Sequence, residues 1–132
     1  LVGSEMCIRD RDIMAYWSLI TYTRPDTDKE WYVQDSVDEI KSEKYKSGEG
    51  IGRLIVELEN TGKITHYSIS ESNDGLKQYI KLGFDSKETF DKFIADKDTA
   101  QPNQTSHRDN WVSEIGLTCD IQNTESEPTI TL

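Results

Sequence analysis

The sequence has 132 residues, a formal net charge of −10 and 34% hydrophobic residues. This length predicts one domain with a substantial core, and no apolar run approaches the roughly 20 residues that a membrane-spanning helix needs. The acidic excess disfavours binding to nucleic acid, because Lys and Arg side chains drive that binding by neutralising phosphates. We therefore expect neither a nucleic-acid partner nor a membrane partner.

The first eleven residues, LVGSEMCIRDR, resemble one translated reading frame of an adapter used in transposase-based sequencing libraries. The resemblance implies that residues 1–13 are not native and that the natural chain begins near Met14. Cys7 then belongs to the adapter and Cys119 is a lone cysteine, so neither an intrachain disulfide nor a cysteine metal cluster is expected. A lone cysteine and the lack of a recognisable signal peptide favour a cytoplasmic location. If the gene belongs to a phage, a possibility taken up below, this location would be the cytoplasm of the host cell.

The N-terminal half of the chain predicts a strand and two helices. Residues 16–23 (YWSLITYT) are aromatic and β-branched and stop at a proline-containing turn, which predicts a strand. Residues 36–46 are predicted as a helix with Ser36 at its N-cap. Residues 51–60 match both the spacing of an amphipathic helix and the alternation of a strand. We favour the helix, because Gly62 lies where a C-terminal capping glycine belongs.

The middle of the chain predicts a β-hairpin. Residues 64–71 (ITHYSISE) and 76–84 (LKQYIKLGF) have the composition of strands. The residues between them, 72–75 (SNDG), form the strongest turn signal in the chain. Gly75 is expected to adopt a positive φ, which a β-branched residue resists.

The C-terminal third predicts a helix, a loop, a strand and a tail. Residues 86–97 should form a helix capped by Ser86, with its aromatic residues on one face. A polar loop is expected at 100–109 and a strand at 111–121. Residues 123–132 are polar and are predicted to be a mobile tail.

The predicted order is strand, helix, strand, strand, helix, strand, which is the split βαβ arrangement of ferredoxin-like domains. In this order it resembles the small dimeric α+β barrel proteins, which include cofactor-free monooxygenases. The FDSKETF stretch at 84–90, a strand running into a capped helix, is typical of that superfamily. The expected fold is α+β, a four-stranded antiparallel sheet with helices on one face, in a single domain at 14–122 followed by the tail. The chain also resembles uncharacterised small proteins of marine tailed phages, a likeness that rests on no matched motif.

Few residues are candidates for chemistry. His66 could act as a general base or a ligand, because an imidazole titrates near neutral pH, although histidines on a sheet face more often only pack there. His66 and His107 do not have the spacing of a metal site, and Cys119 has the surroundings of a buried structural thiol. Neither a metal nor another cofactor is expected.

Four tyrosines and one isoleucine are predicted to share the open face of the sheet: Tyr16, Ile20, Tyr22, Tyr67 and Tyr79. Such a face could be a dimer interface, the lining of a small-molecule pocket, or a platform that stacks RNA bases. The charge of the chain disfavours RNA. The interface is the leading interpretation, because monomers rarely expose large apolar patches without a use for them.

Three functions are compatible with the sequence. The first is a non-catalytic accessory protein that forms a homodimer through the tyrosine-bearing face. The second is a cofactor-independent enzyme of the dimeric-barrel type, in which His66, Tyr67 and Tyr79 would position an apolar or aromatic small molecule and transfer protons. The third is an acidic mimic of nucleic acid. No motif selects a reaction.

Overall fold

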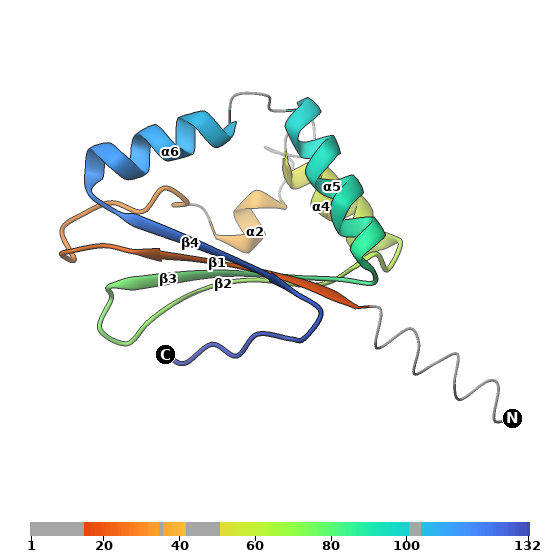
Figure 1. Ribbon diagram of the computed structural model, residues 1–132, viewed down its shortest axis with the longest axis horizontal. Coiled ribbons are helices and arrows are strands. Elements are labelled where there is room, and N and C mark those ends of the chain that lie inside the picture. Colours follow the sequence, from red (N-terminus) through yellow and green to blue (C-terminus); the bar gives the residue numbers. More distant parts are fainter. Residues whose placement is uncertain (1–14, 35, 42–50, 101–103) are drawn as a thin grey trace, which may run out of the picture.

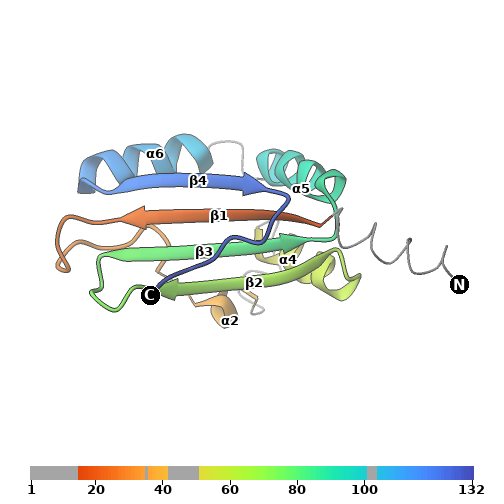
Figure 2. The same ribbon diagram turned by 60° about the horizontal axis from the view of Figure 1, so that its bottom comes forward.

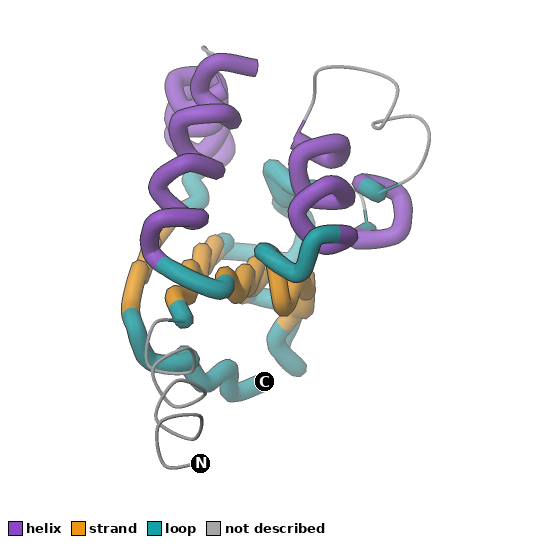
Figure 3. The backbone as a smooth tube through the Cα atoms, turned by 90° about the vertical axis from the view of Figure 1, so that its right-hand side faces the viewer, coloured by secondary structure: helices purple, strands orange, loops and turns teal. Residues whose placement is uncertain are grey.

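The computed structural model describes residues 15–34, 36–41, 51–100 and 104–132. The elements in these ranges are β1 (Tyr16–Thr23), α2 (Val37–Ile40), α4 (Ile51–Asn60), β2 (Ile64–Glu71), β3 (Lys77–Phe84), α5 (Lys87–Ala100), α6 (Gln104–Ile115) and β4 (Thr118–Thr124). The strands form one antiparallel sheet, and the helices lie together on one of its faces (Figures 1 and 3).

The strand order β2-β3-β1-β4 is that of the split βαβ fold. Strand β1 lies between β3 and β4, so that Ile20 is opposite Ile80 of β3 on one side and Ile121 of β4 on the other. Strands β2 and β3 are the two arms of the predicted hairpin. The ferredoxin-like α+β fold expected from the order of the elements is confirmed.

Local sequence signals explain two of the helices. Ser36 caps α2 with a complete capping box, in which the Ser36 hydroxyl accepts from Glu39 N and the Glu39 carboxylate accepts from Ser36 N. Helix α2 ends at Ile40 with Lys41 as its C-cap, so it is shorter than the helix predicted at 36–46, of which residues 42–46 lie outside the described residues. Residues 51–60 form a helix as favoured, and Gly62 follows it with a φ of +73°.

The strand predicted at 111–121 is wrong in its first half, and the loop predicted at 100–109 is partly helical. Helix α6 occupies Gln104–Ile115, and Gly116 ends it with a φ of +84° before β4 begins. Trp111, Val112 and Ile115 recur at helical spacing and pack on the second of the two core clusters. Local β-propensity gave the wrong answer here because burial of one helical face outweighed it.

The core has two clusters beneath the helices. The first lies under α4 and α5 and surrounds Phe84, whose side chain is fully buried. The second lies under α6 and contains Tyr22, Trp31, Ile80 and Leu117. Both clusters lie on the same face of the sheet, so the helices of both halves of the chain pack against one continuous surface.

The C-terminal residues cross the face of the sheet that lies opposite the helices. Strand β4 extends to Thr124, so the first two residues of the predicted tail belong to the sheet. Residues 125–132 then run across β1 and β3 toward the end of β2 (Figure 2). The Leu132 carbonyl accepts from Asn73 N at 3.0 Å, and Glu127 lies 3.7 Å from Lys81. The tail thus covers part of the face that the helices leave open.

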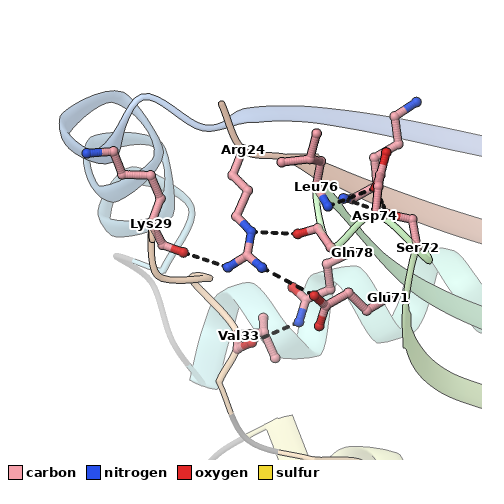
Figure 4. Close-up of polar contacts among 10 residues, drawn as sticks. Arg24, Lys29, Val33, Glu71, Ser72, Asp74, Leu76 and Gln78 are labelled. Carbon is pink, nitrogen blue, oxygen red and sulfur yellow. Dashed lines mark hydrogen bonds and ion pairs between the residues drawn. The ribbon is translucent and has the colours of Figure 1, made fainter. Parts of the chain in front are cut away.

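The predicted turn of the hairpin is confirmed at Gly75, which has a φ of +74°. The Asp74 carboxylate accepts from Leu76 N at 3.0 Å and from the Ser72 hydroxyl at 2.6 Å, and these contacts lower the pKa of Asp74. The guanidinium of Arg24, which follows β1, donates to the Gly75 carbonyl at 2.7 Å (Figure 4). The turn is therefore stabilised by hydrogen bonds within it and by a hydrogen bond from the residue that follows β1.

We expect Gly75→Val to lower the free energy of unfolding by about 1 kcal/mol or more, because a valine resists this positive φ. A Cβ at position 75 would also lie 3.3 Å from the Glu71 carboxylate. Urea unfolding measures the loss. Gly62→Val is the matched control for the crowding, since Gly62 has a φ of +73° but no atom lies within 4 Å of the place that a Cβ would occupy. An unchanged midpoint for Gly75→Val would contradict the assignment of the turn.

Candidate functional site

A cavity of about 120 Å³ lies between the sheet and the helices, at the junction of the two core clusters. Most of its wall is apolar and comes from six residues: Ile20, Val33, Ile40, Ile55, Ile80 and Leu82. The remainder of the wall is made by three tyrosines and two cations: Tyr22, Tyr32, Tyr67, Lys97 and Arg108. We call this cavity the helix-side pocket.

The alternation of the strands builds the floor of the helix-side pocket. Side chains two apart on a strand share a face, so Ile20 and Tyr22 point to the same side of β1. The register places Ile20 opposite Ile80, and Tyr67 opposite Leu82, so all of these residues face the helices. An irregularity in β2 between Ile64 and His66 allows both Ile64 and Tyr67 to pack inward.

The tyrosines supply hydroxyl groups in an apolar wall. Tyr22 is only 2% exposed, and its ring lies 6.4 Å from that of Tyr32. Burial raises the pKa of Tyr22, and the neighbouring Cys119 adds to the effect. Burial also raises the pKa of Tyr67 to about 12, with a smaller contribution from Glu59. Both phenols are therefore neutral near pH 7, where they can donate a hydrogen bond but are poor proton acceptors.

The two cations come from different helices. Lys97 is in the last turn of α5 and Arg108 is in α6, and both contribute to the wall of the helix-side pocket. Burial lowers the pKa of Lys97, and the charge of Arg108 lowers it further, against a rise from Asp98. The Arg108 side chain is 17% exposed and contacts the Asp109 carboxylate at 3.4 Å. The helix-side pocket thus combines an apolar body with local positive charge.

Sequence analysis missed both cations, although their spacing was informative. Lys97 follows the buried Phe93 by four residues, and Arg108 precedes Trp111 and Val112 by three and four. These intervals place each cation on the inward face of its helix. Arg108 was assigned to a loop because the helical phase of α6 was not recognised.

The predicted open face of tyrosines is wrong for four of its five residues. Tyr16, Ile20, Tyr22 and Tyr67 pack with the helix-side clusters, and only Tyr79 lies on the opposite face. The register is the reason, because Ile20 is opposite Ile80 and therefore lies on the helix-covered side with it. Tyr16 contacts the ring of Phe90 of α5 at 5.0 Å. Whether Tyr79 contributes to an interface stays a prediction.

The three catalytic candidates do not meet. His66 lies on the open face, where its Nε2 is 2.8 Å from the Ser68 hydroxyl, whereas Tyr67 points into the helix-side pocket. Tyr79 shares the face of His66 but lies four positions farther along the hairpin ladder, and its hydroxyl donates to the Thr131 carbonyl at 3.4 Å. Burial lowers the pKa of His66, and Lys81 adds to this effect.

A second cluster on the open face surrounds His66. The centres of the His66 and Trp17 rings are 5.9 Å apart, and the Lys81 ammonium lies 5.1 Å from the centre of the Trp17 ring. Trp17 in turn covers Gly83, where a Cβ would come within 2.6 Å of the indole. The cluster is a packed cation–aromatic contact beneath the tail, which gives His66 a structural partner.

The described residues offer no metal centre and no membrane segment. Within residues 15–34, 36–41, 51–100 and 104–132, no group of three or more His, Cys, Asp or Glu side chains is placed to hold a metal ion. The side chain of His107 lies outside the described residues. In the same part of the chain, no helix has both the length and the apolar character needed to cross a membrane. Burial raises the pKa of the Cys119 thiol, which keeps it protonated at neutral pH.

Comparisons with known proteins support the fold. No family model and no curated protein matches the sequence. The crystal structure of a dimeric ferredoxin-like protein from an uncultured marine organism matches with a TM-score of 0.55 and 17% identity, covering 94% of this chain and 99% of that one. The structure of Rv0793 from Mycobacterium tuberculosis has a TM-score of 0.33 at 12% identity over 81% of this chain and 92% of that one, a likeness too low to inform the fold. No comparison supports the likeness to phage proteins. The protein has the ferredoxin-like α+β fold.

Proposed function

We propose that the protein binds a small, mainly apolar molecule in the helix-side pocket. The observation that carries the proposal is a cavity of about 120 Å³ with a largely apolar wall and polar groups at a few fixed points. Protein interiors are normally close-packed, so a partly open pocket of this size between the sheet and the helices is unusual. An apolar cavity of about 150 Å³ holds benzene, which sets the ligand at about the size of one ring.

The wall favours binding over catalysis. Its polar side chains are tyrosines, a lysine and an arginine. These groups can orient a ligand and stabilise negative charge, but the raised pKa values of Tyr22 and Tyr67 make these two phenols poor general bases at neutral pH. His66, the sequence candidate for proton transfer, lies on the other face of the sheet. A binding protein is therefore the function that the arrangement supports best.

Filling the pocket should weaken binding strongly. We expect toluene and benzyl alcohol to bind the unaltered protein saturably, with chemical-shift changes in protein-detected NMR at pocket residues. Val33→Trp should weaken this binding at least tenfold, because Val33 lines the pocket and the indole would occupy it. Val56→Trp is the matched control, since Val56 is half-buried on α4 outside the pocket wall. Equal binding by the two variants, both folded by thermal unfolding, would refute the proposal.

A homodimer is a second proposal, favoured by the structural neighbour that is described as dimeric and has the same fold over 94% of this chain. The face of the sheet opposite the helices carries Trp17, Leu19 and Tyr79. Residues 125–132 cover part of this face, and Leu19 is only 7% exposed. We propose that a second copy packs against this face and that the tail competes with it.

Sedimentation at micromolar concentration tests the homodimer. We expect the full chain to associate more strongly in moderate salt than in low salt, because two chains of net charge −10 repel and salt screens that repulsion over about 8 Å at physiological ionic strength. A chain ending at Thr124 should associate more tightly, since removal of the tail uncovers Leu19 and Tyr79. A monomer for both chains in both salts would contradict the proposal.

A further inference from the structure

Two partly buried cations converge on one apolar cavity in a protein that is strongly acidic. Lys97 reaches the helix-side pocket from α5, and Arg108 reaches it from α6. The chain as a whole carries a net charge of −10, so this local excess of positive charge runs against the overall balance. Burying a cation is unfavourable unless a partner compensates it. Asp98 and Asp109 offset part of this positive charge, and an anion bound in the pocket would offset more of it.

The solvent-exposed lysines of α5 form ion pairs with aspartates of the same helix. Lys87 pairs with Asp91 at 2.9 Å, and Lys92 pairs with Asp96 at 2.7 Å, each at the next turn of the helix. Lys97 differs, because the position four residues later is Gln101. Among the residues that the structure describes, no carboxylate lies within ion-pair distance of the Lys97 ammonium.

Arg108 is only partly compensated. Its one ion pair within the described residues is with Asp109 at 3.4 Å, and the Asp109 side chain is 64% exposed. A charge-assisted bond of this kind is normally closer to about 2.8 Å, so the contact leaves most of the donor capacity of the guanidinium unused. The positive charge of the Arg108 guanidinium still reaches the interior. It lowers the pKa values of Tyr22 and Cys119, which burial raises.

The polar groups on the floor of the pocket fit the same ligand. Tyr22 and Tyr67 present neutral hydroxyls, which can donate to an acceptor oxygen as well as accept. A carboxylate has two oxygens and can accept from a guanidinium, an ammonium and a phenol at once. The apolar residues would surround the body of the ligand, and a cavity of about 120 Å³ limits that body to one ring or a short chain.

We infer that the helix-side pocket selects small carboxylic acids, with Lys97 and Arg108 binding the carboxylate and the apolar wall enclosing a benzoate-sized body. This inference rests on the proposed function of the pocket and names the chemical class of its ligand. The lowered pKa of Lys97 agrees with it, because burial disfavours the charged form of this lysine and a bound anion would favour that form again.

Benzoate and benzyl alcohol test the inference, because the two molecules have nearly the same shape and differ in charge. We expect benzoate to bind the full chain at least tenfold more tightly than benzyl alcohol in titration calorimetry or NMR at pH 7. Lys97→Met should remove most of this preference and leave the affinity for benzyl alcohol within about twofold, since a methionine conserves the apolar volume. Lys87→Met, a loss of the same charge from the exposed side of α5, should change neither affinity.

The outcomes separate the two proposals. Equal affinity of the unaltered protein for the two probes, or a benzoate preference that survives both Lys97→Met and Arg108→Gln, would overturn the selection for acids while the pocket proposal stands. Binding of neither probe would overturn both proposals. If Lys97→Met does not fold, as judged by thermal unfolding, Lys97→Gln takes its place with the same expectation.

Discussion

Phe84→Ala is expected to lower the free energy of unfolding by about 3–5 kcal/mol, the range for a large aromatic residue deleted from a packed core. Phe84 is 0% exposed and lies at the end of β3, directly beneath α5. Its ring contacts those of Phe90 and Phe93 at 5.4 and 5.5 Å. Urea unfolding followed by circular dichroism measures the loss, which is a large fraction of the stability of a typical domain.

Two controls make the Phe84 measurement specific. Phe84→Leu keeps most of the buried volume and should cost less than about 1.5–2 kcal/mol. Phe90→Ala should cost less than Phe84→Ala, because Phe90 is only half-buried although it belongs to the same aromatic cluster. If Phe84→Ala and Phe90→Ala cost the same, Phe84 is not the centre of the first core cluster.

Arg24→Ala should lower the free energy of unfolding by about 3 kcal/mol, since hydrogen bonds from a charged group contribute about 1.5–3 kcal/mol each. The guanidinium donates to the Gly75 and Lys29 carbonyls, both at 2.7 Å, and to the Glu71 carboxylate at 3.2 Å (Figure 4). It also lies 4.3 Å from the centre of the Trp31 ring. The variant would leave two carbonyl groups without this donor. Urea unfolding provides the measurement.

Arg24→Lys and Arg53→Ala are the controls for this prediction. A lysine keeps the charge but cannot donate to three separate acceptors with the geometry of the guanidinium, so Arg24→Lys should be intermediate. Arg53 pairs with Glu57 on the surface of α4, where the side chain is 56% exposed. Arg53→Ala should therefore cost less than about 0.5 kcal/mol. A similar loss at Arg24 and Arg53 would mean that the interactions of Arg24 contribute little.

The Arg24 contacts also bear on the helix-side pocket. They join the end of β1, the turn of the hairpin and the segment that leads to Trp31 and Val33. The Val33 carbonyl in turn accepts from the buried Gln78 side chain at 3.0 Å (Figure 4). Because Val33 lines the pocket, this network fixes one wall of the pocket to the sheet. Arg24→Ala should therefore weaken binding as well as stability.

The sequence by itself determined the features that depend on neighbouring residues. The turn at Gly75 follows from residues 72–75, and the capping box of Ser36 and Glu39 follows from a four-residue motif. The order of the elements was sufficient to predict the ferredoxin-like sheet, because few topologies connect two split βαβ halves with short loops.

Only the tertiary structure decided which side of the sheet each strand residue faces. Alternation shows that Tyr16, Ile20 and Tyr22 share a face, but only the pairing of Ile20 with Ile80 shows that this face is covered by helices. The two paired residues are far apart in the chain, and no local propensity encodes their pairing. The same holds for α6, whose helical form is stabilised by packing of its apolar side chains on the sheet. The convergence of Lys97 and Arg108 on one cavity arises in the same way, because it requires two helices to be placed over a common floor.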